Sequence, residues 1–344
     1  MLYNQIMGFP HFSGVFGVYD RTTAIEAGSA GFADKNFSVP NNPAFGYQTA
    51  SGTKGFTAVA LLSLAAGGKV GLDDRAKRLL QSCPDSPKYG SLEWLSEGVT
   101  LRSLLNHTSG VPDYFDEDFV DDFEAALCGG ANYRYEKPEH FFPLMEAAWR
   151  KSNRPYAAAG SFKYSNSGFV ILAAVVEAVS GEIFPDFVAG HVFKPFGMGR
   201  SGFFRLDGLA PDGIVKASAY QKNGRSNVYA VPVIGGGDGG AYTNPQDMAR
   251  FWTGLDPDLN PHSPLAPLVE EAWTAGQDGD DGLYGLGFWM RKENLRIVFL
   301  EGFDPGVQFF SYYNRDTKRS LTICLNDEAA GCGEVFERYF SMIE

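Results

Sequence analysis

The sequence predicts an α/β fold in which both chain ends build one antiparallel sheet flanked by helices, with a mainly helical lobe inserted between them. Strand-like runs occupy residues 12–33 and return towards the end of the chain, whereas residues 70–250 are rich in helical patterns and loops. We therefore expect a sheet domain made of residues 1–70 plus 283–344, and an inserted lobe of residues 71–282. The active site is expected where the two meet.

The first part of the chain is predicted to form two strands and a helix. Residues 12–19 (FSGVFGVY) and 24–33 (AIEAGSAGFA) are typical of strands, and the second contains glycines suited to turns. Residues 53–66 (TKGFTAVALLSLAA) have a helical pattern. Gly67 and Gly68 follow directly, and glycines just past the last periodic residue favour a helix end.

The remaining elements are predicted from capping residues and from alternating patterns. Helices are expected at 100–106 with Thr100 as N-cap, at 167–180 closed by Gly181, and after Asn244 with Pro245 in the first turn. Neighbouring strands joined by turns are expected at 284–290, 295–300, 307–313 and 320–326, followed by a closing helix at 334–343.

Composition excludes several classes of function. The chain carries 29 basic and 41 acidic side chains, which gives a formal charge of −12. Binding to nucleic acid or to anionic lipid needs a basic face, so the charge argues against both. No stretch approaches the ~20 apolar residues of a membrane span, and residues 1–10 lack the features of a signal peptide. We expect a cytoplasmic protein without a membrane span.

The chain offers no pattern for a metal or a cofactor, so we expect none. The cysteines form no C-x-x-C pair and are expected to be free thiols: Cys83, Cys128, Cys324 and Cys332. The five histidines show no metal-ligand spacing. Residues 235–240 can be fitted to G-x-G-x-x-G, but they do not lie between a strand and a helix, so a turn near the cleft is expected instead.

The tetrapeptide Ser51-Gly52-Thr53-Lys54 predicts a nucleophilic serine. At the first turn of a helix, positions i and i+3 share a face, so Lys54 can reach the Ser51 hydroxyl. An ammonium group has no lone pair, and Lys54 must therefore be neutral when it accepts a proton. The helix N-terminus also presents backbone N–H groups that can stabilise an oxyanion.

A second candidate element is Tyr164-Ser165-Asn166, directly before the apolar helix. A phenol placed between Ser51 and Lys54 can relay protons, and the Asn166 amide can hold both Lys54 and a substrate carbonyl. The alternative is a helix-capping loop with a packed tyrosine, and these three residues by themselves do not decide between the two.

Several stretches together resemble the class C β-lactamase-like group of serine hydrolases, which includes D-aminopeptidases, DD-carboxypeptidases and family VIII carboxylesterases. They occur in the family's order along nearly the whole chain: FSGVFGVYD (12–20), GSAGFAD (28–34), QTASGTKGFTA (48–58), LAAGGKVGLDD (64–74), TLRSLLNHTSGVPDY (100–114), FKYSNSGFVILAAVVEAVSG (162–181), GGGDGGAYTNPQDMARF (235–251) and EGFDPGV (301–307). The resemblance implies a β-lactamase/transpeptidase-like fold. It also implies that Ser51 is acylated, that Lys54 and Tyr164 form the general base system and that Asn166 helps to position substrate. HTSG at 107–110 would be a structural turn.

The third motif of this family is changed here. Relatives carry Lys-Thr-Gly or His-x-Gly on a strand beside the nucleophile, and the amide after the glycine completes the oxyanion hole. This chain has Leu300-Glu301-Gly302-Phe303, which puts Leu300 at the basic position, or Glu301 if the alignment slips by one residue. The cation that meets the carboxylate of a β-lactam is missing in either alignment. We expect the Phe303 amide to remain available, and neutral or amine-bearing substrates to be favoured.

The resemblance therefore implies a serine hydrolase that acts through a Ser51 acyl-enzyme on a small ester, amide or peptide, as an esterase or a D-amino-acid peptidase or amidase does. Two alternatives stay open. A non-catalytic, penicillin-binding-like sensor module would pair Glu301 with Lys54, and a DD-peptidase or β-lactamase proper would need the missing cation. Oligomeric state is left open by the sequence.

Two details complete the expected site. No class A-like Glu loop that would activate water is found, so Tyr164 is expected to serve both acylation and deacylation. The acidic, aromatic stretch 113–123 (DYFDEDFVDDF) either borders the cleft or forms a surface helix.

Overall fold

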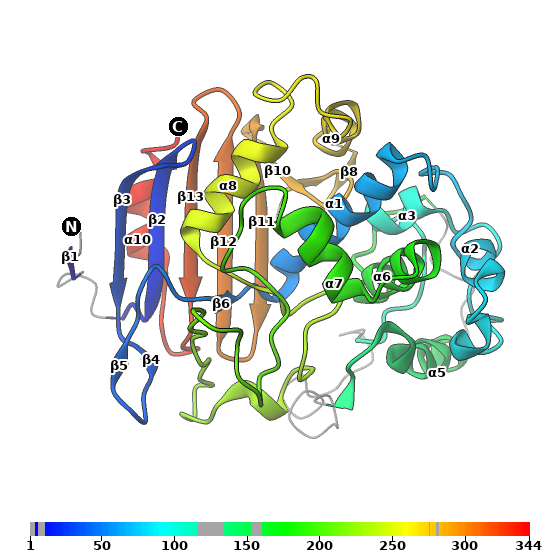
Figure 1. Ribbon diagram of the computed structural model, residues 1–344, viewed down its shortest axis with the longest axis horizontal. Coiled ribbons are helices and arrows are strands. Elements are labelled where there is room, and N and C mark those ends of the chain that lie inside the picture. The colour runs from blue at the N-terminus through cyan, green and yellow to red at the C-terminus, as the bar shows by residue number, and fades with distance from the viewer. Residues whose placement is uncertain (1–3, 6–10, 116–133, 153–159, 275, 280–281) are drawn as a thin grey trace.

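The protein is described by a computed structural model that covers residues 4–5, 11–115, 134–152, 160–274, 276–279 and 282–344. In this part of the chain, nine strands form one sheet with helices on both faces (Figure 1). The order across the sheet is β1 (Asn4–Gln5), β3 (Thr23–Ala30), β2 (Gly14–Asp20), β13 (Arg319–Leu325), β12 (Val307–Asn314), β11 (Asn294–Asp304), β10 (Trp289–Arg291), β9 (Leu283–Tyr284) and β8 (Gln277–Asp278). Two short pairs lie outside it: β4 (Phe32–Asp34) with β5 (Val39–Pro40), and β6 (Tyr47–Gln48) with β7 (Tyr242–Thr243).

Both chain ends meet at the centre of this sheet, as the sequence predicts. β13 pairs antiparallel with β2, with Leu321 opposite Val18, so the last strand of the chain lies against one of the first. The pairs β2–β3, β11–β12 and β12–β13 are antiparallel too, whereas the short β1 runs parallel to β3. The prediction of an antiparallel sheet built from both ends and flanked by helices is confirmed.

Helices cover the two faces of the sheet. α10 (Gly333–Phe340) lies behind it in Figure 1 and packs Tyr339 on Phe16, with the ring centroids 4.3 Å apart. α8 (Pro245–Leu255) crosses the front face. Its close approach depends on Gly17, where an added Cβ would lie 2.8 Å from the Cβ of Pro245. Any larger residue at this position would push α8 off the strand.

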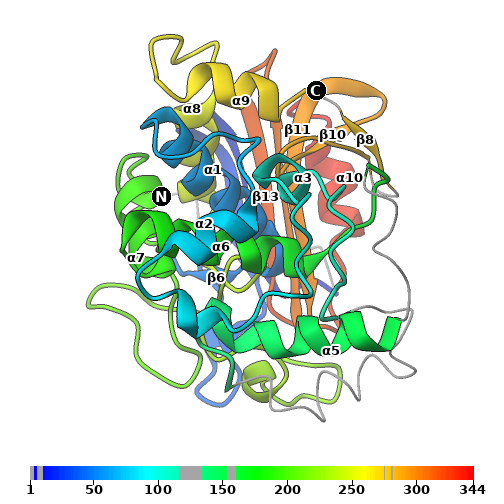
Figure 2. The ribbon, with the colours of Figure 1, turned by 90° about the vertical axis from the view of Figure 1, so that its right-hand side faces the viewer.

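The helical part of the molecule packs beside the sheet around α1 (Thr53–Ala66) and α6 (Asn166–Ser180) (Figure 2). Nearly every residue of α1 is buried, which is typical of a central helix that is apolar all round. The other helical segments are η1 (Ala50–Gly52), α2 (Ala76–Ser82), η2 (Ser86–Tyr89), α3 (Leu101–Leu105), η5 (Pro138–Phe141), α5 (Phe142–Ser152), α7 (Phe184–Val188), η6 (Ala189–Phe193), η7 (Asn227–Tyr229) and α9 (Ala266–Ala272). The lobe boundaries at residues 70 and 283 stay a prediction.

The predicted helix ends are confirmed by their capping contacts. Thr100 accepts a hydrogen bond from the Ser103 N–H, and Asn244 accepts one from the Asp247 N–H. Gly181 adopts a left-handed φ of 77° after α6, a conformation that glycine tolerates without strain.

The strand expected at 284–290 is wrong as a single element. The segment instead forms a tight hairpin in which β9 and β10 pair with each other, Tyr284 opposite Trp289. Gly287 has a φ of 87°, and an added Cβ there would collide with Ala58 of α1. The alternating pattern hid this turn because both arms of the hairpin are buried.

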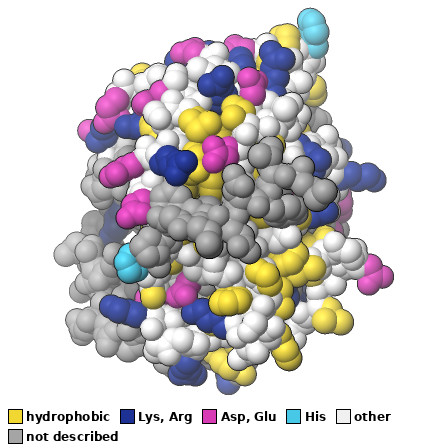
Figure 3. Space-filling model, turned by 90° about the vertical axis from the view of Figure 1, so that its left-hand side faces the viewer, with side chains coloured by type: hydrophobic (Ala, Val, Ile, Leu, Met, Phe, Trp, Pro, Cys, Tyr) yellow, Lys and Arg dark blue, Asp and Glu magenta, His cyan; other side chains and the backbone are white. Residues whose placement is uncertain are grey.

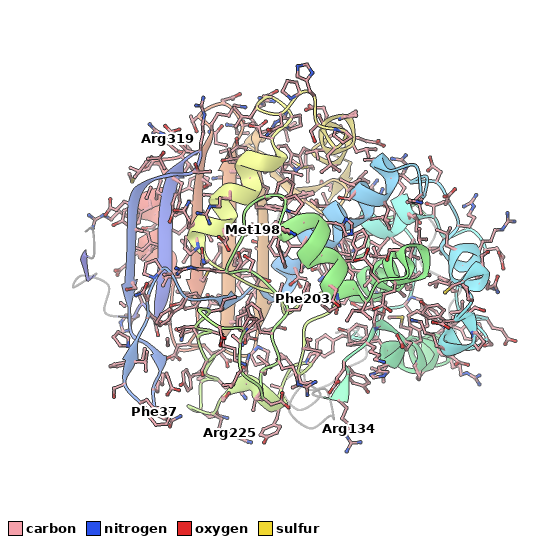
Figure 4. All side chains as sticks on the ribbon, in the orientation of Figure 1. Phe37, Arg134, Met198, Phe203, Arg225 and Arg319 are labelled. Carbon is pink, nitrogen blue, oxygen red and sulfur yellow. The ribbon has the colours of Figure 1, made fainter. Side chains whose placement is uncertain are left out.

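A long connection after η6 joins the sheet to the helical part. Figure 4 shows Met198 and Phe203 near the middle of the molecule, and the Phe203 ring contacts Phe184 of α7 at 5.5 Å. Phe37 and Arg225 lie at the lower end of the same view, and Phe37 is 81% exposed. On the face shown in Figure 3, the visible basic and acidic side chains are interspersed rather than gathered by sign.

Three features bear on partners and redox chemistry. Within the described ranges no single helix meets the requirements of length and apolarity for crossing a membrane, although α6 and 184–193, bent by 80°, meet them as a pair. Cys83, Cys324 and Cys332 are free thiols, while Cys128 lies outside the described residues. No group of three or more His, Cys, Asp or Glu side chains that could hold a metal occurs in the described part of the chain.

Candidate active site

The candidate nucleophile sits in a strained turn. Ser51 is the middle residue of η1, and Ala50 before it has a φ of 43°, which costs a non-glycine residue about 1–3 kcal/mol. Backbone bonds hold this turn: the Gly240 N–H donates to the Ala50 carbonyl (3.3 Å) and the Thr49 N–H donates to the Ala241 carbonyl (2.9 Å). Ser51 as a whole is partly exposed.

Lys54, one turn further on, is 2% exposed and donates to three acceptors. These are Ser51 Oγ at 2.8 Å, Asn166 Oδ1 at 2.8 Å and the Asp238 carbonyl at 2.7 Å. A neutral amine keeps two N–H donors and one lone pair. Neither the Asn166 oxygen nor the Asp238 carbonyl carries a proton, so of these three partners only the Ser51 hydroxyl can donate to the lone pair of a neutral Lys54.

The Tyr164-Ser165-Asn166 segment reaches the same lysine. Ser165 caps α6 by accepting from the Gly168 N–H (3.3 Å), which places Asn166 in the first turn. The Tyr164 ring lies over Lys54, with Nζ 4.9 Å from the ring centroid. Among the described residues, the Tyr164 hydroxyl makes no hydrogen bond with Ser51 or Lys54. The structure thus brings Ser51, Lys54 and Tyr164 together. Tyr164 contacts Lys54 through the face of its ring rather than through its hydroxyl.

Asp113 is a site residue that sequence reasoning missed. Its buried carboxylate accepts from the backbone N–H of Asn166 (3.1 Å), from the Asn166 side-chain amide (3.1 Å) and from the backbone N–H of Ser167 (3.2 Å). Since the amide nitrogen faces Asp113, the oxygen must face Lys54. Burial raises the pKa of Asp113, although these N–H donors and Lys54 oppose the shift. Its position in the acidic stretch 113–123 was the available signal; residues 116–123 lie outside the described part.

The glycine loop at 235–240 joins the site as a turn, as predicted. Besides the Asp238 carbonyl that binds Lys54, the loop offers the Gly237 carbonyl to the Thr57 hydroxyl (2.6 Å). The Asp238 carboxylate accepts from the Tyr114 hydroxyl at 2.5 Å. The acidic stretch therefore touches the site through Tyr114, and the sequence did not single out either partner of this bond.

Strand β11 carries the altered third motif, Leu300-Glu301-Gly302-Phe303, into the site. Leu300 is 2% exposed and packs on Gly55 of α1, where an added Cβ would lie 2.5 Å from the leucine. Two residues later, Gly302 faces the nucleophile turn, and a Cβ there would lie 2.5 Å from the Ser51 nitrogen. Glu301 and Phe303 point to the other side of the strand by alternation; Phe303 is 58% exposed and its ring contacts Phe310.

The carboxyl groups of Asp238 and Asp304 lie close enough to Lys54 for its charge to oppose the rise of their pKa values. Burial raises the pKa of Asp238. Burial, together with the charge of Asp238, raises the pKa of Asp304 at the end of β11 to about 7. The charge of Glu301 contributes, after burial and Tyr164, to the raised pKa of Tyr284.

Comparison with known proteins finds a matching family and several relatives. The sequence model of the family described as Beta-lactamase matches residues 5–334. The chain is 31% identical to a penicillin-binding protein from Bacillus halodurans over 96% of this chain and 97% of that one, with a TM-score of 0.81. It is 25% identical to a D-stereospecific amidohydrolase from Streptomyces sp., covering 94% and 92% of the two chains, with a TM-score of 0.73.

A curated relative is longer than this chain. A penicillin-binding protein of Bacillus subtilis is 27% identical over 87% of this chain but only 65% of its own length. The chain thus spans somewhat less than two thirds of that relative.

Proposed function

Since the chain belongs to the Beta-lactamase family, we propose that it is a serine hydrolase that forms an acyl-enzyme on Ser51 with a small ester, amide or peptide. The hydrogen bonds of Lys54 are the observation that carries this proposal. They leave the Ser51 hydroxyl as the only one of the three partners that can donate to a neutral lysine. Members of this family are serine hydrolases, and the fold and the motif order agree with that activity.

The proposed reaction follows from these contacts. Lys54 takes the proton of Ser51 Oγ as the oxygen attacks the substrate carbonyl carbon, and the amides of Ser51 and Phe303 stabilise the oxyanion. The bond to the leaving group then breaks as that group receives the proton, by way of Lys54 and Tyr164. In the second half-reaction a water molecule loses a proton to the same pair and attacks the ester carbon, which releases the acid and restores Ser51.

The groups around the site limit the classes of substrate that we propose. Asp238 and Asp304 are carboxyl groups near Lys54, and Asp304 becomes charged only above about pH 7. Glu301 adds a charge near Tyr284, while Leu300 occupies the place that the family resemblance gives to a cation. We expect an uncharged ester or amide, or an amide with a free amine, to be preferred over a β-lactam. The likeness to a protein described as a D-stereospecific amidohydrolase supports amides as one class to test.

Labelling with a fluorophosphonate tests the proposed function. Phosphonylation of a serine oxygen expels fluoride, so mass spectrometry of the digested protein should find the adduct on Ser51 and on no other serine. The variant Ser51→Ala should carry none. Ser63→Ala is the matched control, because this serine lies on α1 and its hydroxyl only donates to the Val59 carbonyl. An unlabelled Ser51 with undiminished ester hydrolysis in Ser51→Ala would contradict the proposal, and an unlabelled protein without any hydrolysis would favour the binding-module alternative.

The raised pKa of Asp304 gives a pH test of the substrate class. With a pKa of about 7, this carboxyl is neutral in acid and charged above neutrality, so attraction of a cation should grow as pH rises. We expect KM for a trimethylammonium thioester, relative to its uncharged tert-butyl isostere, to fall about fivefold between about pH 6 and about pH 8. The permanent charge removes titration of the substrate itself.

Two pairs of thioesters are compared, one with the trimethylammonium or tert-butyl group on the acyl side and one with it on the thiol side. Together they cover both ways in which the charged end of a substrate can lie in the site. Asp304→Asn should abolish the pH dependence of the KM ratio. A ratio that does not change with pH for either pair would contradict the preference for cations.

A further inference from the structure

His107 lies next to the Tyr164-Ser165-Asn166 segment, and its main chain is hydrogen-bonded to the residue that precedes the segment. It follows α3 with a φ of 58° and is 1% exposed. Its carbonyl accepts from the Lys163 N–H at 2.9 Å, one residue before Tyr164. A positive φ is uncommon outside glycine, although histidine adopts it more readily than most residues.

The His107 side chain contacts two consecutive residues, Tyr164 and Ser165. Nδ1 accepts from the backbone N–H of Ser165 at 3.1 Å. The imidazole ring also packs on the Tyr164 ring, with centroids 4.3 Å apart and an angle of 33° between the planes. One side chain thus holds both the main chain and the ring of the tyrosine whose face lies over Lys54.

The charge state of His107 suits this contact. Burial, and then the charge of Lys54, lower the pKa of His107 well below its usual value, so the ring is neutral. Because Nδ1 accepts a hydrogen bond, the proton of the neutral ring resides on Nε2. Nε2 has no hydrogen-bond partner in the described part of the chain, although a buried unpaired donor is unfavourable.

A catalytic base role for His107 on the neighbouring Ser109 does not fit these contacts. The acceptor nitrogen of the ring is occupied by the Ser165 N–H. The Ser109 hydroxyl oxygen instead accepts from the backbone N–H of Val111 at 3.2 Å within its own turn.

We propose that His107 is a positioning residue for Tyr164: its Nδ1 fixes the Ser165 N–H and its ring supports the tyrosine, which together set the phenol over Lys54. This inference rests on the proposed function, because it assigns His107 a part in the proton transfers of the Ser51 reaction. It goes beyond the structural turn expected for HTSG, since the contact acts on the candidate proton relay.

Two substitutions separate positioning from packing. His107→Ala removes both the acceptor and the ring, whereas His107→Asn offers a side-chain oxygen near the position of Nδ1 and tolerates a positive φ. With an activated ester, we expect kcat of His107→Ala to fall about 100-fold with KM changed less than about twofold, because misplaced proton-transfer groups act on the chemical step. His107→Asn should regain kcat to within about fivefold of the wild type.

The control for lost stability is Leu105→Ala, which empties a fully buried site at the end of α3. It should lower the melting temperature and leave kcat unchanged well below the melting point. Wild-type kcat in folded His107→Ala, or equal loss of kcat in the Ala and Asn variants in step with their melting temperatures, would overturn the proposal. Labelling of Ser51 in the wild type separates the proposed hydrolase function from the positioning role. If Ser51 is labelled and His107→Ala keeps the kcat of the wild type, only the positioning role of His107 is rejected.

Discussion

Replacing Lys54 with arginine is expected to lower kcat for ester hydrolysis by about a thousandfold even though the positive charge is kept. Arginine cannot lose its proton in a protein, so it can donate to Asn166 and to the Asp238 carbonyl but cannot accept the proton of Ser51. Lys54→Met, which removes both charge and base, should be impaired to a similar degree. Steady-state kinetics on a p-nitrophenyl ester measure both variants.

Lys69→Arg is the matched control, since this lysine is exposed just beyond the end of α1, and it should leave kcat unchanged. Thermal melting separates a folding defect from a chemical one, because Lys54 is buried and the longer arginine needs space. If folded Lys54→Arg kept kcat within a few-fold of the wild type while Lys54→Met lost it, Lys54 would supply charge, and the base would have to be sought in Tyr164.

Replacing Gly302 with alanine is expected to lower kcat by about 100-fold or more, because the nucleophile turn must move. An added Cβ would lie 2.5 Å from the Ser51 nitrogen and 2.7 Å from the Gly52 nitrogen, and it would also collide with the Thr49 carbonyl. All three are backbone atoms, which cannot rotate away as a side-chain tip does. The displacement affects the amide that would bind the oxyanion, so the rate of Ser51 labelling should fall together with kcat.

Gly333→Ala controls for the loss of a glycine, since an added Cβ at the start of α10 meets nothing within 4 Å. It should leave both kcat and the labelling rate unchanged. We expect Gly302→Ala also to lose about 1–3 kcal/mol of folding free energy, measured by denaturant unfolding. Undiminished labelling of Ser51 in Gly302→Ala would show that β11 does not set the geometry of the nucleophile.

Apart from the hairpin at 284–290, the sequence determined the main elements and the order of the motifs. The α1 pattern and its glycine stop, the caps at Thr100 and Asn244, and Gly181 after α6 all act within a few residues, and the structure contains each of them. The i, i+3 spacing of Ser51 and Lys54 is local as well, and their side chains lie 2.8 Å apart. Short-range periodicity and capping chemistry suffice for such features.

Only the tertiary structure decided what surrounds that pair. Asp113 orients the Asn166 amide across 53 positions of sequence, and the Asp238 carbonyl reaches Lys54 across 184. A carbonyl oxygen is present in every residue and carries no sequence signal, so no pattern could have picked out Asp238. The family alignment could place Leu300 and Gly302 on β11. It could not show that Leu300 fills the core against α1, or that Gly302 lies against the backbone of Ser51. These contacts depend on how β11, α1 and α6 pack, which is set by burial summed over the whole core rather than by any local run of residues.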